Sequence, residues 1–465
     1  MADDRRMSDV EALMWTIEKD PALTSSFANV TILDRPPDVE RLRRRLEEAT
    51  AAVPRLHQRV APALGRLAPP EWQDDPDFDI GYHVRHLALP APGTERQLFD
   101  LASLLAQAPF DRTRPLWEFT IVDGVDGGRA ALFQKLHHTI TDGEGGVRMS
   151  VQFLDLDREG SGAARAPAHP AEPAAPEPPG PANLFGTAFE TVAHNLRRQL
   201  GIARRAAEEA AGFVTHPERL AGASTEIVET VRSLARQVAV TDRARSPLWT
   251  TRSLRRRFEV LQVPLDDAKR AAKTLGGSVN DVFVTGAAGA AGAYHRAKGA
   301  DVDELRISMP VSTRSRGEVG GNAFAPSRVL VPVGIEDPVA RFAAVRDRLA
   351  VTKRERALGL ASALAGVMNV LPTSVLVRFA RQQVETVDFA TSNVRGAPFD
   401  LYVAGARIEA NYPMGPLAGT AFNITLLSYR GSLDMGLNID AAAIDDPELL
   451  RTCMEEAFAD LLEAG

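Results

Sequence analysis

Cysteine is almost absent from this chain of 465 residues. Its one thiol, Cys453, has no partner for an intrachain disulfide, and the neighbouring acids Glu455 and Glu456 disfavour a reactive thiolate. We therefore expect Cys453 to be a packing residue of a C-terminal helix, in a protein of the reducing cytoplasm. The sequence also has no CxxC or HxxxH pair, which excludes the common zinc patterns and predicts no metal site.

An excess of positive charge is missing as well. Lysine and arginine total 54 against 61 acids, which gives a formal net charge of -7. Binding to nucleic acid needs a basic footprint, so we expect no nucleic-acid partner. Arg252 and the run Arg255–Arg257 would be able to meet the phosphates of a small ligand, although a solvated face is the simpler interpretation.

Long apolar runs are few. The first ten residues, MADDRRMSDV, lack the apolar stretch of a secretory signal. The longest run without charge, Ala357–Val377, contains Asn369 and Pro372, so it predicts two short helices rather than a membrane span.

Signatures of several enzyme classes do not occur. The chain has no GxSxG nucleophile elbow, which disfavours a serine hydrolase, and no Walker or GxGxxG phosphate loop. The length and the ordinary apolar content instead predict two globular domains. We expect an α/β (α+β) unit over residues 1–159, a Pro/Ala-rich linker over 160–183, a helical connection over 184–250 and a second α/β unit over 251–465.

Apolar periodicity predicts the individual elements. Helices are expected over residues 39–51, 98–108, 147–154, 265–275, 279–295 and 447–462. Strands are expected over residues 119–122, 130–136, 260–263, 306–311 and 327–333, followed by a β-meander over 408–412, 421–429 and 432–438. A further amphipathic helix over 184–214 would either pack on a domain or rest on a membrane surface.

The most informative segment follows the strand expected over 130–136. It reads His137-His138-Thr-Ile-Thr-Asp142-Gly143 and leads into a Gly-rich helix start. Neighbouring residues of a strand point to opposite faces, so both histidines would face one site only if the strand has ended. A neutral imidazole titrates near cellular pH and is the commonest general base. Asp142 would either accept from a histidine or pair with an arginine and hold the loop's shape, and Gly143 permits unusual backbone conformations.

A lone histidine base suits direct transfer, in which an acceptor alcohol itself attacks an acyl donor. The motif resembles the HHxxxDG signature of acyltransferases related to chloramphenicol acetyltransferase and to peptide synthetase condensation domains. Other segments stand in a matching order: Pro115-Leu116-Trp117, Asn280-Asp281, Met309-Pro-Val-Ser-Thr-Arg314, Gly321-Asn322, Asn393-Val-Arg-Gly and Asn411-Tyr-Pro. With them, nearly the whole chain outside the linker resembles the bacterial wax ester synthase/diacylglycerol acyltransferase family.

This resemblance implies two chloramphenicol-acetyltransferase-like domains with a tunnel between them. It implies an acyl-CoA co-substrate, no bound cofactor, and a lipid alcohol as acceptor. Diacylglycerol would give triacylglycerol, and a fatty alcohol would give a wax ester. The enzyme would be cytoplasmic and would sit peripherally on the inner membrane face or on lipid droplets.

The resemblance also assigns roles within the motif. His138 would be the base, His137 a supporting residue, and Asp142 mainly structural, with Arg314 as one partner. Gly143 completes the motif.

The remaining matched segments receive roles in the same way. Asn280 would lie near the reacting centre as a hydrogen-bond donor, and Asp281 would hold the helix start, although both residues are also favoured helix caps. Pro115, Leu116 and Trp117 would line the acyl tunnel or pack in the core.

Two departures from the family pattern bear on the choice of substrate. Met7–Trp15 replaces an opening Pro-Leu segment, and Arg395 and Ala397 replace prolines of an Asn-Val-Pro-Gly-Pro segment. Two alternatives stay open: a condensation-type transferase that uses a carrier-bound acyl donor, and a non-catalytic lipid-binding relative.

Overall fold

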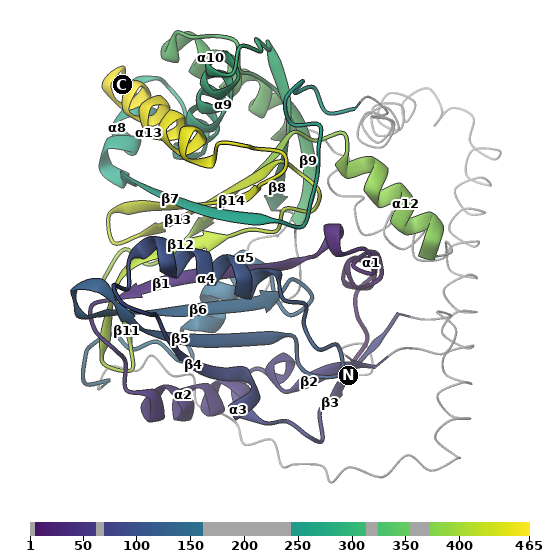
Figure 1. Cartoon of the computed structure of the whole chain (residues 1–465), viewed down its shortest axis with the longest axis vertical. Coiled ribbons are helices and arrows are strands. Elements are labelled where there is room, and N and C mark those ends of the chain that lie inside the picture. Colours follow the sequence, from purple (N-terminus) through teal and green to yellow (C-terminus); the bar gives the residue numbers. More distant parts are fainter. Residues whose placement is uncertain (1–4, 62–68, 161–242, 313–323, 354–372) are drawn as a thin grey trace, which may run out of the picture.

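The computed structural model describes residues 5–61, 69–160, 243–312, 324–353 and 373–465 (Figure 1). The expected linker after Gly160 and nearly all of the expected helical connection lie outside these ranges. So do the expected helix over 184–214, Arg314, Gly321 and Asn322, and the first part of the run Ala357–Val377.

Two six-stranded sheets organise the described chain, one in each half of the view in Figure 1. The first has the strand order β11-β12-β1-β6-β5-β4 and the second β7-β14-β13-β10-β8-β9. The strands of the first sheet are β1 (Ser26–Leu33), β4 (Val84–Ala88), β5 (Trp117–Val125), β6 (Arg129–His137), β11 (Tyr402–Val403) and β12 (Ala406–Met414). Those of the second are β7 (Arg256–Pro264), β8 (Glu304–Ser312), β9 (Phe324–Pro332), β10 (Phe389–Arg395), β13 (Phe422–Tyr429) and β14 (Ser432–Asp440).

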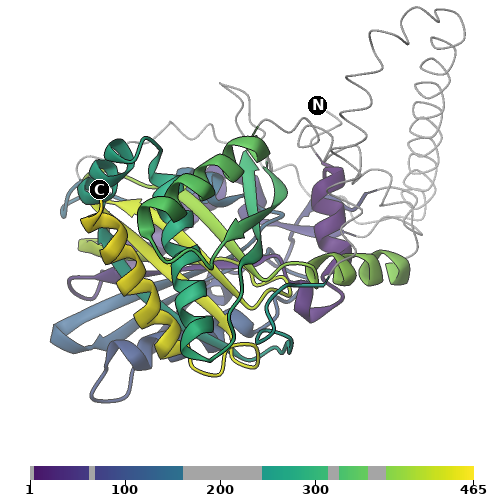
Figure 2. The ribbon, with the colours of Figure 1, turned by 90° about the horizontal axis from the view of Figure 1, so that it is seen from above.

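Helices pack against both sheets and connect their strands along the chain. The first half of the chain carries α1 (Asp9–Ile17), α2 (Val39–Ala52), α3 (Ile80–His83), α4 (Glu95–Gln107) and α5 (Gly143–Ser150), with the small hairpin β2 (Gln58–Ala61) and β3 (Glu71–Asp74). The second half carries α8 (Leu265–Thr274), α9 (Val279–Ala297), α10 (Pro338–Lys353), α12 (Thr373–Val384) and α13 (Pro447–Glu463). Helices α8, α9, α10 and α13 lie on the outer side of the second sheet, and α12 lies beside α1 (Figures 1 and 2).

The expected mixed α/β class is confirmed, and so are most of the expected elements. The β-meander is wrong, because β12 pairs with β1 in the first sheet, from Ala28↔Met414 to Leu33↔Ile408. Only β13 and β14 pair as expected. Apolar periodicity predicts a strand but not the strand that it pairs with. Here the chain passes from the first sheet to the second between β12 and β13. Helix α5 also begins four residues before the expected start at residue 147.

Glycines in α9 let the neighbouring elements of the outer layer approach closely. A Cβ at Gly286 would come within 2.4 Å of Phe458 in α13, and one at Gly292 within 2.0 Å of the Val333 carbonyl. Cys453 is buried in α13, as expected for a packing residue, and this burial raises the pKa of its thiol. Within the described ranges no helix is both long and apolar enough to cross a bilayer.

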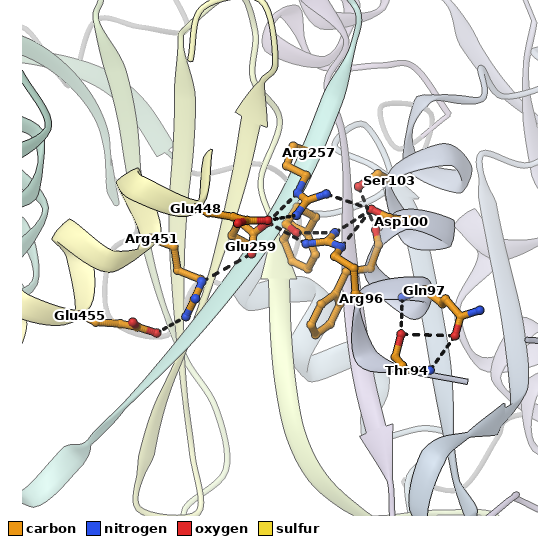
Figure 3. Close-up of polar contacts among 12 residues, drawn as sticks. Thr94, Arg96, Gln97, Asp100, Ser103, Arg257, Glu259, Glu448, Arg451 and Glu455 are labelled. Atoms are coloured by element: carbon orange, nitrogen blue, oxygen red, sulfur yellow. Dashed lines mark hydrogen bonds and ion pairs between the residues drawn. The ribbon is translucent and has the colours of Figure 1, made fainter. Parts of the chain in front are cut away.

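A cluster of charged side chains joins the two halves of the molecule (Figure 3). Its centre is Glu259 on β7, which is 6% exposed. Arg96 of α4 reaches its carboxylate at 2.6 Å and also donates to the Phe258 carbonyl at 2.9 Å. Arg257 lies at 2.6 Å and Arg451 of α13 at 3.7 Å. One buried carboxylate thus holds a helix of the first half against a strand and a helix of the second.

Candidate active site

His137 is fixed at the end of β6 by contacts on both ring nitrogens. Its Nε2 lies 2.6 Å from the Glu18 carboxylate. Its Nδ1 accepts the Thr139 backbone N–H at 3.1 Å, so the ring proton belongs on Nε2 and is donated to Glu18. The histidine is 1% exposed. His137 is therefore buried and held in one orientation, which fits the supporting role that we expect for it.

Glu18 follows helix α1 and accepts hydrogen bonds from three residues in two segments of the chain. Besides His137 it accepts from the Thr24 hydroxyl at 2.7 Å and the Ser25 backbone N–H at 2.8 Å. Burial raises the pKa of this carboxyl, but its hydrogen bond and electrostatic interaction with His137, helped by Thr24 and Ser25, outweigh burial and lower it overall. Glu18 is thus an ionised anchor at neutral pH.

His138 lies just beyond the end of β6, in surroundings different from those of His137. Its backbone N–H donates to the Ser25 carbonyl at 3.1 Å, and its ring packs on Phe27 with 4.6 Å between ring centroids. Desolvation lowers the pKa of His138 to about 4, and His137 lowers it too, whereas Asp142, the Thr141 backbone and Glu18 act in the opposite direction. The imidazole is therefore neutral at pH 7 and able to accept a proton.

Asp142 and the glycines after it set the shape of the loop that carries the histidines. The Asp142 carboxylate caps α5 by accepting the Gly145 N–H at 2.7 Å, which explains why α5 begins at Gly143. A Cβ at Gly145 would come within 2.0 Å of the Thr141 hydroxyl, and one at Gly143 within 3.0 Å of Val394 in β10. The loop is thus tightly turned and presses against the second sheet.

Pro115, Leu116 and Trp117 are buried at the start of β5. The Trp117 indole stacks on His83 at 4.5 Å and donates to the Leu56 carbonyl at 2.7 Å. The Leu116 carbonyl accepts the His137 backbone N–H at 3.0 Å. This segment packs in the core and sets the register at the histidines, while its contact with substrate stays a prediction.

Asn280 and Asp281 begin helix α9. Asp281 forms a capping box with Ser278, accepting its backbone N–H at 2.8 Å and its hydroxyl at 2.7 Å, so it does hold the helix start. The side-chain Oδ1 of Asn280 accepts from the side-chain Nδ2 of Asn393 in β10 at 3.2 Å. Asn280 also lines a cavity of about 380 Å³, and neither His137 nor His138 is among the described residues that line it.

The structure therefore brings the motif histidines together with Glu18, and it places Asn280 in a neighbouring cavity. The link between them is β10, whose Val394 faces Gly143 and whose Asn393 contacts Asn280. Whether Asn280 donates to the reacting carbonyl stays a prediction, as does substrate contact by Asp281. No group of three potential metal ligands occurs among the described residues.

Family models match most of the chain. The model for the wax ester synthase/diacylglycerol acyltransferase catalytic domain covers residues 7–283, and the model for the C-terminal domain of the same family covers 320–462. The chain belongs to the wax ester synthase/diacylglycerol acyltransferase family. This acyltransferase family is the one that the HHxxxDG, Pro-Leu-Trp and Asn-Asp segments indicate.

Relatives and solved structures agree with this family. A protein of Mycobacterium tuberculosis strain H37Rv, provisionally named a diacylglycerol O-acyltransferase, is 34% identical over 98% of this chain and 92% of its own length. A relative of the same provisional name from Mycobacterium bovis is 28% identical over 95% of this chain and 92% of its own. The wax ester synthase/diacylglycerol acyltransferase structure from Marinobacter aquaeolei VT8 superposes with a TM-score of 0.66 at 21% identity, covering 98% of both chains.

A second structural neighbour is the starter condensation domain of rhizomide synthetase, solved in complex with C8-CoA. It superposes with a TM-score of 0.60 at 14% identity, covering 99% of this chain and 95% of that domain. At such identities the likeness shows the fold alone. This chain thus shares its fold with both members of the family and condensation domains, as the HHxxxDG motif indicates.

Glu18 is the residue of this family member's site that the sequence does not reveal. It lies 119 positions before His137 and belongs to no motif. The departure from the family pattern over Met7–Trp15 falls in the segment that forms α1 and leads into Glu18. Only the fold brings the end of α1 next to the end of β6.

We expect Glu18→Gln to lower kcat about tenfold, equal to about 1.4 kcal/mol of activation barrier, because the neutral amide weakens the charge-assisted hydrogen bond that orients His137. KM for both substrates should stay within about twofold, since Glu18 acts through His137 and not on substrate. Steady-state kinetics beside the exposed control Glu40→Gln would test this. An unchanged kcat, or a loss confined to KM, would contradict the positioning role.

Proposed function

We propose that this chain is an acyl-CoA-dependent O-acyltransferase that esterifies a lipid alcohol, with His138 as the general base. The observation that carries the proposal is the neutral His138 imidazole beside a histidine held by Glu18, in a member of an acyltransferase family. Diacylglycerol and long-chain fatty alcohols are the proposed acceptors. The names of the mycobacterial relatives support the first of these, and the family name supports both.

The reaction that we propose has no covalent enzyme intermediate. The acceptor hydroxyl gives its proton to the His138 imidazole while its oxygen attacks the thioester carbonyl carbon. The tetrahedral oxyanion collapses, the C–S bond breaks, and the imidazolium returns the proton to the leaving thiolate of CoA. The oxyanion needs a donor, for which Asn280 or a backbone N–H is the candidate.

The enzyme must take its acceptor, a water-insoluble alcohol, from a lipid phase. We therefore propose peripheral contact with the inner membrane face or a lipid droplet. No metal or bound cofactor enters the proposed chemistry, because the thioester is already activated and the base is a side chain.

Ester formation from palmitoyl-CoA tests the proposal. Purified enzyme is supplied with palmitoyl-CoA and either hexadecanol or dipalmitoylglycerol, and wax ester or triacylglycerol is measured by mass spectrometry. Parallel reactions use palmitoyl-acyl-carrier protein as donor. If ester forms with the acyl-carrier protein as donor but not with palmitoyl-CoA, the result would support a condensation-type enzyme. If no combination of donor and acceptor gives ester, it would support a non-catalytic relative.

The acid limb of the pH profile should lie unusually low. His138 must be neutral to accept a proton, and its pKa is lowered to about 4, so it stays neutral as the pH falls from 8 to about 5. We expect kcat/KM for acyl-CoA to remain nearly flat over that range and to decline only below it. Enzyme returned to pH 7 after each acid exposure controls for unfolding. A reversible decline centred near 6.5, the ordinary value for histidine, would contradict this account.

A further inference from the structure

Lys135 is a buried lysine that has no part in the proposed mechanism. It lies on β6 two residues before His137, so the two side chains share one face of the strand. The residue is only 1% exposed. Burial of an ammonium group is unfavourable unless the protein supplies partners for it, so a lysine at this position needs an explanation.

The Lys135 ammonium is held by the end of helix α4 and by an aromatic ring. It donates to the backbone carbonyl of Ala108, the C-cap residue of α4, where the helix dipole favours a cation. It also lies over the face of Phe110, 4.2 Å from the ring centroid. Both partners belong to the segment that leaves α4, so Lys135 fixes that segment against β6.

Phe110 connects this lysine to the motif. The Phe110 and His137 rings meet edge to face, with 6.4 Å between their centroids and 73° between their planes. The same phenyl ring therefore contacts a buried cation and the histidine that donates to Glu18. Loss of the cation would free the ring to move, and His137 would lose one wall of its pocket.

A second ring with a cation on its face contacts the same histidine. Trp15 of α1 meets the His137 imidazole at 6.4 Å and 81°. The Cζ atom of Arg112 lies 3.3 Å from the Trp15 ring centroid, and its guanidinium donates to the Trp15 carbonyl at 2.8 Å. Arginine keeps its charge over the pH range of an enzyme assay, so only the Lys135 side of this arrangement titrates.

Charges on neighbouring elements act on Lys135 together with burial. Burial lowers the pKa of its ammonium to about 8; Glu118 opposes this, Arg85 adds to it, and Glu18 raises the pKa. Glu118 stands opposite Lys135 in the β5–β6 register and pairs with Arg85 of β4 at 3.1 Å. Ala28, opposite on β1, and the partners from the segment after α4 carry no charge. Lys135 is therefore mostly protonated at pH 7 and neutral well above pH 8.

We propose that Lys135 is a positioning residue of the acyl transfer: its ammonium holds Phe110 against His137 and so keeps that imidazole in the orientation that supports His138. The role requires the charge, because the attraction to the ring face is that of a cation. Deprotonation, like removal of the side chain, loosens His137 without changing a contact with substrate. This inference rests on the proposed function for the reaction, and the coupling to His137 is measurable without turnover.

Kinetics of four full-length proteins test the need for the charge. The wild type, Lys135→Met, Lys135→Arg and Lys298→Met form ester from palmitoyl-CoA between pH 7 and 9.5, with uncatalysed thioester hydrolysis subtracted. Methionine removes the charge and keeps a flexible apolar side chain, whereas arginine keeps the charge over this range. Lys298 also lies over an aromatic ring, 5.7 Å from the Tyr294 centroid at the end of α9, and is the matched control. Melting curves at each pH identify the folded proteins.

We expect Lys135→Met to lower kcat about fivefold at pH 7 and to leave KM within about twofold, since Lys135 acts through His137. Wild-type kcat should fall towards the Lys135→Met value as the pH rises through about 8, and Lys135→Arg should keep its kcat to pH 9.5. Lys298→Met should follow the wild type. If folded Lys135→Met turns over as the wild type does, or the wild-type kcat is level to pH 9.5, the inference is wrong while the proposed function stands.

Histidine resonances separate failure of this inference from failure of the proposed function. Enzyme that carries nitrogen-15 in its histidines is titrated over the same pH range without substrate, and His137→Gln assigns the His137 signals. We expect these signals to shift with a midpoint near pH 8 in the wild type and to stay constant in Lys135→Met and Lys135→Arg. That result supports the positioning role even if palmitoyl-CoA gives no ester. Constant His137 signals in the wild type overturn it even if ester forms.

Discussion

His138→Ala is expected to lower kcat by a factor on the order of 10² to 10⁴, the usual contribution of a positioned general base. In the proposed mechanism the desolvated, neutral imidazole takes the acceptor's proton, and alanine removes it entirely. The variant should fold normally, because the imidazole is neutral at pH 7 and its removal leaves no buried charge without a partner. Steady-state kinetics with thermal melting would measure both effects.

Two other histidines make this prediction specific. His86 lies in β4 and pairs with Asp123 of β5 at the surface, so His86→Ala should retain full activity. His137→Ala should lose less activity than His138→Ala but more stability, since it leaves the partly buried Glu18 carboxylate without its main partner. Equal loss of activity in the two motif variants would not show which histidine is the base. A near-normal kcat of His138→Ala would show that His138 is not the base.

Glu259→Ala is expected to destabilise the protein by about 3 kcal/mol, the lower end of the range for breaking a buried ion pair, because its arginine partners are partly exposed. The substitution leaves Arg96, Arg257 and Arg451 facing one another without their shared carboxylate (Figure 3). The cluster spans the two halves of the molecule, so the loss should appear as a lower urea midpoint and also as weaker ester synthesis near that midpoint.

Exposed acids of the same cluster provide the matched controls. Glu448 and Glu455 pair with Arg257 and Arg451, but their side chains are 75% and 45% exposed. Screening by solvent limits such pairs to about 1 kcal/mol or less, so their alanine variants should unfold near the wild-type midpoint. If Glu259→Ala behaves like these two, the contact between the halves rests on apolar packing rather than on the buried carboxylate.

Local features of this fold can be predicted from the sequence, whereas contacts between distant parts of the chain cannot. The alternation and periodicity of apolar residues predict the bounds of five elements to within three residues, because those patterns depend on near neighbours in the sequence. These elements are β5, β6, α2, α9 and α13. The pairing of β12 with β1 escapes the same reasoning, since a strand carries no mark of its partner 380 residues away. The early start of α5 reflects Asp142 acting as a helix cap.

The site divides in a similar way. His137, His138 and Asp142 stand in one motif, and their spacing suffices to single them out. Glu18 and the cavity beside Asn280 depend on tertiary contacts, and no local sequence pattern indicates either. The arginines considered for phosphate binding show the converse. Arg252 donates to the Trp249 and Gly419 carbonyls, Arg256 donates to the Ser253 carbonyl, and Arg257 pairs with Glu259, so three of these four cations form bonds within the fold.

Ester formation by wild type beside His138→Ala, with palmitoyl-CoA as the only acyl donor, tests the central claim most directly. We predict that the wild type converts hexadecanol or dipalmitoylglycerol into ester with release of free CoA, and that the folded variant forms ester at no more than about one hundredth of that rate. A folded His138→Ala that synthesises ester at near the wild-type rate, or a wild type that forms none from palmitoyl-CoA, would contradict the claim.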